Sequence, residues 1–92
     1  SLELTPNNVS YIDTYGWILY QEKKYDEAKK YLEKAFDRGG FNRPAIVEHY
    51  GDVLYKLNEI DKAVENWKKA KELGNKSDLL QKKITDKKLY EE

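Results

Sequence analysis

The sequence predicts an all-α fold in which two similar helical hairpins stack side by side and a last helix closes the array. Three observations lead to this prediction. The chain repeats itself with a period of 35 residues, only two of its 92 residues are proline, and glycine recurs where helices are expected to end. A period of this length is typical of stacked helical repeats, in which no unit can bury its own apolar face. Such a stack presents an extended surface suited to holding another molecule.

The repeat appears when residues 13–42 are laid over residues 48–77. Identical residues then coincide at positions that include Tyr15 and Tyr50, Gly16 and Gly51, Leu19 and Leu54, Tyr20 and Tyr55, Ala28 and Ala63, Ala35 and Ala70, and Gly39 and Gly74. A glycine inside a helix costs about 1 kcal/mol, so its presence twice at one register indicates a packing reason. We expect Gly16 to face Ala28 and Gly51 to face Ala63, which would bring the helices of each hairpin close together.

The first hairpin is expected to span two helices joined by a polar turn. Asn8 can cap a helix that runs to about Glu22. Apolar and small residues at helical spacing form its buried stripe: Ile12, Tyr15, Gly16 and Leu19. A second helix runs from about Tyr25 to Arg38 and ends at Gly39, because glycine accepts the left-handed conformation found at helix ends. Its buried residues are expected to be Tyr25, Ala28, Leu32, Ala35 and Phe36.

The second hairpin follows the same plan. Pro44 suits the first turn of a helix, where its missing N–H is not needed. The expected buried residues are Val47, Tyr50, Gly51 and Leu54 in this helix, then Ile60, Ala63, Trp67 and Ala70 in the next, which ends at Gly74. Ser77 or Asp78 caps a last helix that reaches about Tyr90. Only Leu79, Leu80 and Ile84 supply its apolar stripe.

The small and apolar positions carry a resemblance. Six sites recur in both units: Gly16, Leu19, Tyr25, Ala28, Leu32 and Ala35, then Gly51, Leu54, Ile60, Ala63, Trp67 and Ala70. This pattern resembles the signature of the tetratricopeptide repeat family over about residues 9–74. The resemblance implies one domain, a right-handed α-solenoid with repeats at about 9–42 and 44–77 and a capping helix at about 77–90. Residues 1–8 look like the tail of a preceding repeat.

Two short strings narrow the resemblance. Residues 13–17 and 48–52, followed by Trp67, are similar to the last two repeats of many bacterial tetratricopeptide proteins, often envelope-associated ones. The chain then corresponds to the C-terminal end of a longer array. It departs from the usual pattern at Asn75, where a proline is common, and by one extra residue in the loop 39–43.

In this family the first helix of each repeat lines a concave groove. The resemblance therefore implies a binding surface along a stripe beside the buried one: Asp13, Trp17, Tyr20, Glu48, Asp52 and Tyr55. Aromatic side chains are favoured as anchors, and carboxylates favour basic residues on a protein or peptide partner. The acidic residues of this stripe would also repel the C-terminal carboxylate of heat-shock chaperones, which some tetratricopeptide domains bind. The alternative for Tyr20 and Tyr55 is that they wedge between neighbouring helices.

The sequence offers little for catalysis. His49 is the only histidine and cysteine is absent, so a catalytic zinc site lacks its ligands. Ser10 and Ser77 have no neighbouring base. We expect His49 to form a hydrogen bond between adjacent helices, and we expect a protein that is not an enzyme and has no catalytic residues, metal or cofactor.

Charge composition argues against a nucleic-acid partner. The chain has 17 basic and 17 acidic side chains, whereas nucleic-acid binding needs a one-sided basic excess. The lysines of the last helix are expected to form a solvated face: Lys82, Lys83, Lys87 and Lys88. No apolar run approaches the roughly 20 residues of a membrane span. The compartment stays open.

Two alternatives to groove binding remain. The repeats can be architectural, terminating an array whose groove is empty or is filled by the protein's own segments. They can also self-associate as a homodimer through the outer face of the first repeat, which includes Tyr11 and Tyr31.

Overall fold

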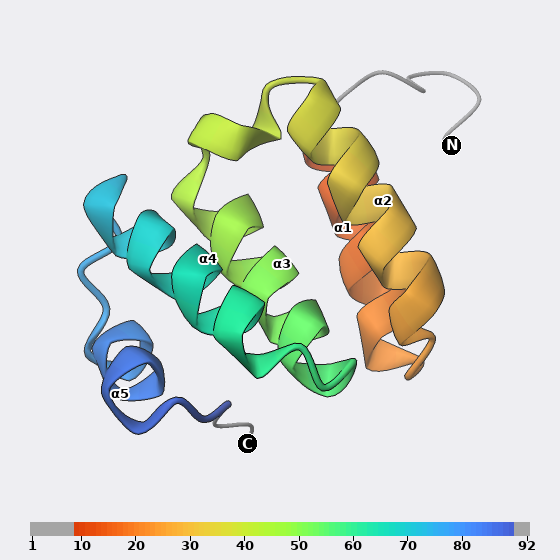
Figure 1. Cartoon of the computed structure of the whole chain (residues 1–92). Coiled ribbons are helices and arrows are strands. Elements are labelled where there is room, and N and C mark those ends of the chain that lie inside the picture. The colour runs from red at the N-terminus through yellow and green to blue at the C-terminus, as the bar shows by residue number, and fades with distance from the viewer. Residues whose placement is uncertain (1–8, 90–92) are drawn as a thin grey trace.

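The computed structural model describes residues 9–89, and that part of the chain is entirely helical apart from its turns, as predicted. The helices form two hairpins and a final single helix. Figure 1 shows the hairpins side by side, with the final helix at the end of the stack away from the first hairpin. None of the described helices is long and apolar enough to span a bilayer. The elements are α1 (Val9–Gln21), α2 (Tyr25–Asp37), the short 3-10 helix η1 (Gly40–Asn42), α3 (Pro44–Lys56), α4 (Ile60–Glu72) and α5 (Asp78–Asp86).

The helix boundaries recur with the predicted period of 35 residues. Helix α3 begins and ends 35 residues after α1, and α4 does the same relative to α2. The turns inside the hairpins both place a residue in the left-handed region, with φ of 64° at Lys23 and 67° at Asn58. The ends of the hairpins do so through glycine, with φ of 100° at Gly39 and 115° at Gly74. The two hairpins are therefore copies of one backbone plan. The proposed cap Asn8 lies outside the described residues.

The core follows the predicted stripes. Tyr15, Tyr25, Phe36, Tyr50 and Ile60 are only partly buried and pack against its edge. Trp67 is the largest side chain that is fully buried. The apolar core consists of Ile12, Leu19, Tyr20, Ala28, Leu32, Ala35, Ile46, Val47, Val53, Leu54, Ala63, Val64, Trp67, Ala70, Leu80 and Leu89.

The two helix glycines, Gly16 and Gly51, let the facing helix of the hairpin approach closely. The nearest side chains, however, are not the alanines that we expected. A Cβ atom added at Gly16 would lie 3.3 Å from Leu32 Cγ, so the nearest neighbour is Leu32 rather than Ala28. A Cβ at Gly51 would lie 2.7 Å from Trp67 Cδ1 and 3.1 Å from the carbonyl oxygen of Ala63. The contact at Gly51 is closer than that at Gly16, because the Trp67 indole lies over Gly51 where the Leu32 side chain lies over Gly16.

The hairpins contact each other through α2 and α3. The rings of Phe36 and Tyr50 meet edge to face with centroids 4.8 Å apart, and the Tyr50 hydroxyl donates to Glu33 Oε2 at 2.9 Å. Burial and the Glu33 carboxylate raise the pKa of Tyr50 above its ordinary value. Lys29 donates to Glu59 Oε2 at 3.2 Å, and this hydrogen bond lowers the pKa of Glu59.

The last helix is shorter than predicted. Ser77 caps it by accepting a hydrogen bond from Leu80 N at 3.4 Å, as expected, but α5 ends at Asp86 and Lys87 is left-handed with φ of 51°. The chain then turns back, and Leu89 is buried. Leu79, placed in the apolar stripe by the sequence, is instead 47% exposed. Leu89 thus supplies apolar contact that a longer straight helix would not. The predicted end at Tyr90 lies outside the described residues.

Candidate functional site

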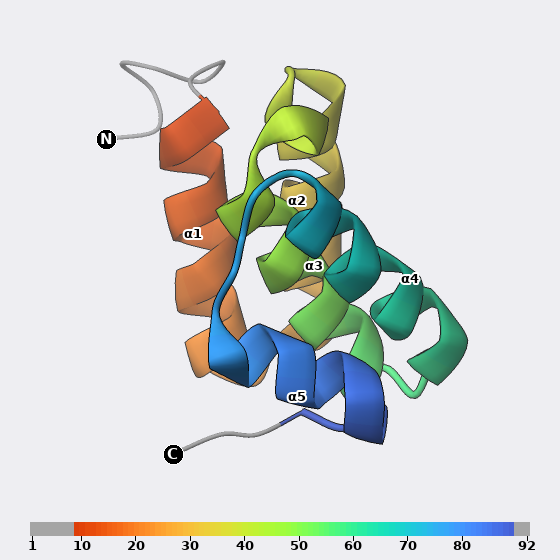
Figure 2. The same cartoon turned by 90° about the vertical axis from the view of Figure 1, so that its left-hand side faces the viewer.

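The predicted stripe lies where successive first helices meet. Figure 2 shows α1 at the left and α3 next to it in the middle of the view, with α5 crossing at the bottom. Two polar contacts join these helices in turn. We call the contact of Asp13 and Trp17 with His49 the first junction, and the contact of Glu48 and Asp52 with Lys83 the second junction.

The first junction joins α1 to α3. His49 Nδ1 lies 3.0 Å from Asp13 Oδ1, which confirms the predicted hydrogen bond of this histidine between adjacent helices. The Trp17 ring stacks on the His49 ring with centroids 4.2 Å apart and on the Tyr20 ring with centroids 4.4 Å apart. These contacts fix the half-buried indole in one orientation.

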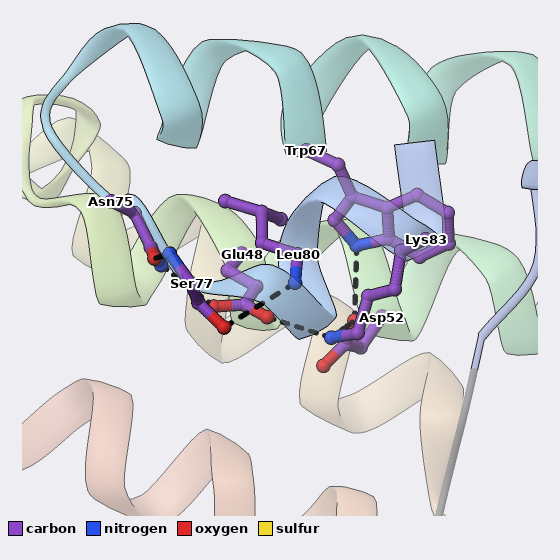
Figure 3. Close-up of polar contacts among 7 residues, drawn as sticks. All are labelled: Glu48, Asp52, Trp67, Asn75, Ser77, Leu80 and Lys83. Atoms are coloured by element: carbon purple, nitrogen blue, oxygen red, sulfur yellow. Dashed lines mark hydrogen bonds and ion pairs between the residues drawn. The ribbon is translucent and has the colours of Figure 1, made fainter. Parts of the chain in front are cut away.

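The second junction joins α3 to α5 through one lysine. Lys83 Nζ lies 2.7 Å from Glu48 Oε2 and 3.0 Å from Asp52 Oδ1, and Figure 3 shows the ammonium between the two carboxylates. The Lys83 side chain is only 4% exposed, so the prediction that this lysine belongs to a solvated face is wrong. Its charge is buried because two carboxylates receive it.

The acceptors of the second junction are themselves held in place. Trp67 Nε1 donates to Asp52 Oδ1 at 3.0 Å, and Asn75 Nδ2 donates to Glu48 Oε1 at 2.9 Å (Figure 3). The Lys83 ammonium also lies 5.7 Å from the centroid of the Trp67 ring, within the range of a cation–π contact. Two carboxylates and one indole therefore recognise one ammonium group.

Burial and charge compete at the second junction. Burial raises the pKa of Asp52 above its ordinary value, and the nearby Lys83 offsets only part of this effect. Burial alone would lower the pKa of Lys83, but the Asp52 and Glu48 carboxylates raise it. The ammonium form is thus the one that the site holds.

The predicted aromatic residues differ in exposure. Tyr20 is buried and meets Tyr25 edge to face with centroids 5.5 Å apart. Tyr55 is half-buried, with its ring centroid 6.0 Å from that of Trp67. Trp17 is also half-buried. Trp17 and Tyr55 therefore keep surface for contact, while Tyr20 is buried and stacks on the Trp17 ring.

Sequence reasoning missed the role of Lys83, although the period contained a signal for it. Asp13, Glu48 and Lys83 are spaced by 35 residues, so the lysine occupies the position of the two acids in the next helix along. Trp17 and Asp52 correspond in the same way. The part of the chain that the structure describes contains no cluster of three side chains suited to holding a metal ion.

Comparison with known proteins agrees with this architecture. Residues 10–38 match the family model of the tetratricopeptide repeat. The fold is similar to that of the N-terminal domain of stress-induced protein-1 from C. elegans, with a TM-score of 0.78 and 22% sequence identity over 94% of this chain and 72% of that one. The search of curated proteins found no match to this chain. Residues 10–38 are thus similar to one tetratricopeptide repeat, and the helical fold of the chain as a whole is similar to that of this solved domain.

Proposed function

We propose that this chain is a non-catalytic interaction module that binds a peptide or helix of a partner protein along the side formed by α1 and α3. Tetratricopeptide repeats generally mediate contacts between proteins. One observation supports this side of the molecule as the binding surface. Helix α3 already holds a helix there, because α5 delivers Lys83 to Glu48 and Asp52. A surface that holds a lysine-bearing helix in cis is suited to a basic partner in trans.

Trp17 is the proposed central anchor. Its ring is held by stacking on Tyr20 and His49, so little rotamer freedom is left to lose when a partner binds. Tyr55 provides a second half-buried ring on α3. Aromatic side chains of this kind bring large contact area at low entropic cost.

The acidic residues of the stripe select the partner's charge. Asp13 and Glu48 both retain some exposure, with side chains 16% and 19% exposed. Asp52 is buried and acts by holding the ammonium of a lysine rather than by meeting solvent. We therefore expect a partner segment with lysine or arginine beside an apolar residue.

A matched pair of variants tests the anchors. Trp17→Ala combined with Tyr55→Ala should reduce partner capture at least tenfold, because both half-buried rings of the stripe are lost. Phe41→Ala is the control, since Phe41 is an exposed aromatic residue in η1, outside the stripe. Photo-crosslinking to cell extract, with circular dichroism as the check of folding, measures the effect. Equal capture by the folded double variant and the control would overturn the groove assignment.

A structural role is the second candidate, and the second junction favours it. The Glu48 and Asp52 carboxylates are neutralised by the protein's own Lys83, as expected of a helix that terminates an array. In that case the Trp17 and Tyr55 variant keeps every interaction of the parent protein, and loss of the repeats lowers only its melting temperature.

Self-association is a third candidate because an apolar side chain is exposed on the first hairpin. Ile18 of α1 is 47% exposed, whereas its counterpart Val53 in α3 is fully buried. Tyr11 and Tyr31, both half-buried, belong to the same hairpin. Sedimentation at increasing protein concentration tests this candidate: Ile18→Lys should abolish any dimer, and a wild-type chain that stays monomeric removes it.

A further inference from the structure

We infer that the second junction is a lysine-binding site for a partner helix, and that α5 is a resident occupant which such a helix displaces. The inference rests on the proposed function, since it assumes that this side of the molecule receives a partner's helix. It adds the identity of the site, the residue pattern of the partner and the competition that sets its affinity.

The site is assembled by the α3–α4 hairpin without help from α5. The Trp67 indole lies directly over Gly51, where a Cβ atom would approach Cδ1 and Nε1 of the ring to 2.7 Å. This close packing fixes the indole, and its N–H fixes the carboxylate of Asp52 at 3.0 Å. An acceptor that is positioned before the ammonium arrives costs little reorganisation on binding.

The second acceptor is positioned from outside α5 as well. Asn75 precedes α5 and donates to Glu48 Oε1, which leaves Glu48 Oε2 directed to the ammonium at 2.7 Å. The face of the Trp67 ring completes the surroundings of the charge. A lysine ammonium, with three donors on a flexible stem, fits two carboxylates and a ring in this arrangement.

Helix α5 indicates which residue pattern the second junction binds. Helix α5 is nine residues long, and it buries Leu80 and Lys83 while its neighbour Leu79 is exposed. Leu80 and Lys83 are three residues apart and so lie on one face of the helix. The partner we infer is an amphipathic helix with an apolar residue three positions before a lysine.

Exchange of the occupant is physically reasonable. A helix as short as α5 is marginal by itself, so it opens locally without unfolding the hairpins. When it opens, Asp52 keeps its hydrogen bond from Trp67 and gains water, so no charge is left buried and unpaired. The apparent affinity for a partner is then reduced by the fraction of molecules in which α5 is closed.

The test uses a fluorescent peptide of residues 76–89, added to the full chain and followed by anisotropy. Leu80→Ala in the chain loosens α5 without touching the acceptors, so the chain should bind the peptide at least about tenfold more tightly than wild type does. The same peptide carrying Lys83→Met should bind at least about tenfold more weakly, because it lacks the ammonium. In the Leu80→Ala chain, Glu48→Gln should weaken binding about fivefold or more, whereas Glu65→Gln on the exposed side of α4 should leave it unchanged.

Equal binding by wild type and the loosened chain would overturn the inference, as would a peptide that binds equally well without its lysine. If Leu80→Ala disrupts folding, Ser77→Ala removes only the cap of α5 and should tighten peptide binding roughly fivefold. Failure here is separable from failure of the proposed function, since partner capture through Trp17 and Tyr55 is measured independently.

Discussion

The first-helix residues of the two junctions occupy equivalent positions of a repeated backbone, but the two junctions differ in burial and in the group that meets the carboxylates. Asp13 corresponds to Glu48 and Trp17 to Asp52, each 35 residues apart. At the first junction the paired side chains of His49 and Asp13 are 27% and 16% exposed. At the second, Lys83 and Asp52 are 4% and 7% exposed.

The difference shows what the repeat does and does not determine. The backbone places a residue of each first helix against the next helix in line, and the side chains decide how that contact is stabilised. At the partly exposed first junction, a stacked indole and imidazole and the hydrogen bond between His49 and Asp13 make the contact. A buried carboxylate such as Asp52 needs a cation and an N–H donor, and Lys83 and Trp67 provide them.

The largest expected effect is a difference in the free energy of unfolding when a charged residue is removed from each junction. Lys83→Met keeps most of the side-chain volume but leaves Asp52 buried without its ammonium, so we expect a loss of about 3 kcal/mol in the free energy of unfolding. Asp13→Asn should cost no more than about 1 kcal/mol, because its partner is partly solvated. Urea unfolding measures both values, and equal costs would contradict the contrast between the junctions.

The helix glycines give the next contrast. Gly51→Ala places a methyl group 2.7 Å from the Trp67 ring and 3.1 Å from a backbone oxygen, so we expect a loss of about 2 kcal/mol. Gly16→Ala meets Leu32 Cγ at 3.3 Å and Tyr31 Cβ at 3.5 Å, and the better helix propensity of alanine should offset these looser contacts to within about 0.5 kcal/mol. Thermal unfolding of the two variants side by side decides the point. A larger loss at Gly16 would show that the hairpins are packed differently.

A smaller effect should appear at alkaline pH. The folded chain raises the pKa of Lys83 above the ordinary 10.5, so the stability from its charge is complete below 10.5 and is lost as the pH rises through the folded value. The stability difference between wild type and Lys83→Met should therefore shrink above about pH 10.5. The raised pKa of Tyr50 also lowers the stability of the folded chain in this range, but Tyr50 is present in both proteins, so its effect cancels in the difference. A difference that stays constant up to pH 12 would show that the ammonium is not what the site holds.

The regular part of the fold was predictable because it depends on period and spacing. Helices α1 to α4 begin and end within a residue or two of the expected positions, and His49 forms the expected bond to α1. These features follow from apolar periodicity, glycine at helix ends and the exact recurrence of both.

The second junction was not predicted, although the 35-residue spacing of Asp13, Glu48 and Lys83 contained a signal for it. A lysine beside other lysines indicates a solvated face, and only the tertiary contact with Glu48 and Asp52 makes burial of Lys83 favourable. The early end of α5 was missed as well: the helix ends at Asp86, and Leu89 after the turn is buried. Both depend on where α5 packs, which the spacing of its own residues does not determine.

The most direct test of the account is a pair of double-mutant cycles on the free energy of unfolding. One cycle combines Asp52→Asn with Lys83→Met, and the other combines Asp13→Asn with His49→Gln. We predict a coupling of about 2 kcal/mol for the first pair and no more than about 0.5 kcal/mol for the second. A first coupling near zero, or one no larger than the second, would contradict the claim that α5 is held on α3 by a buried lysine.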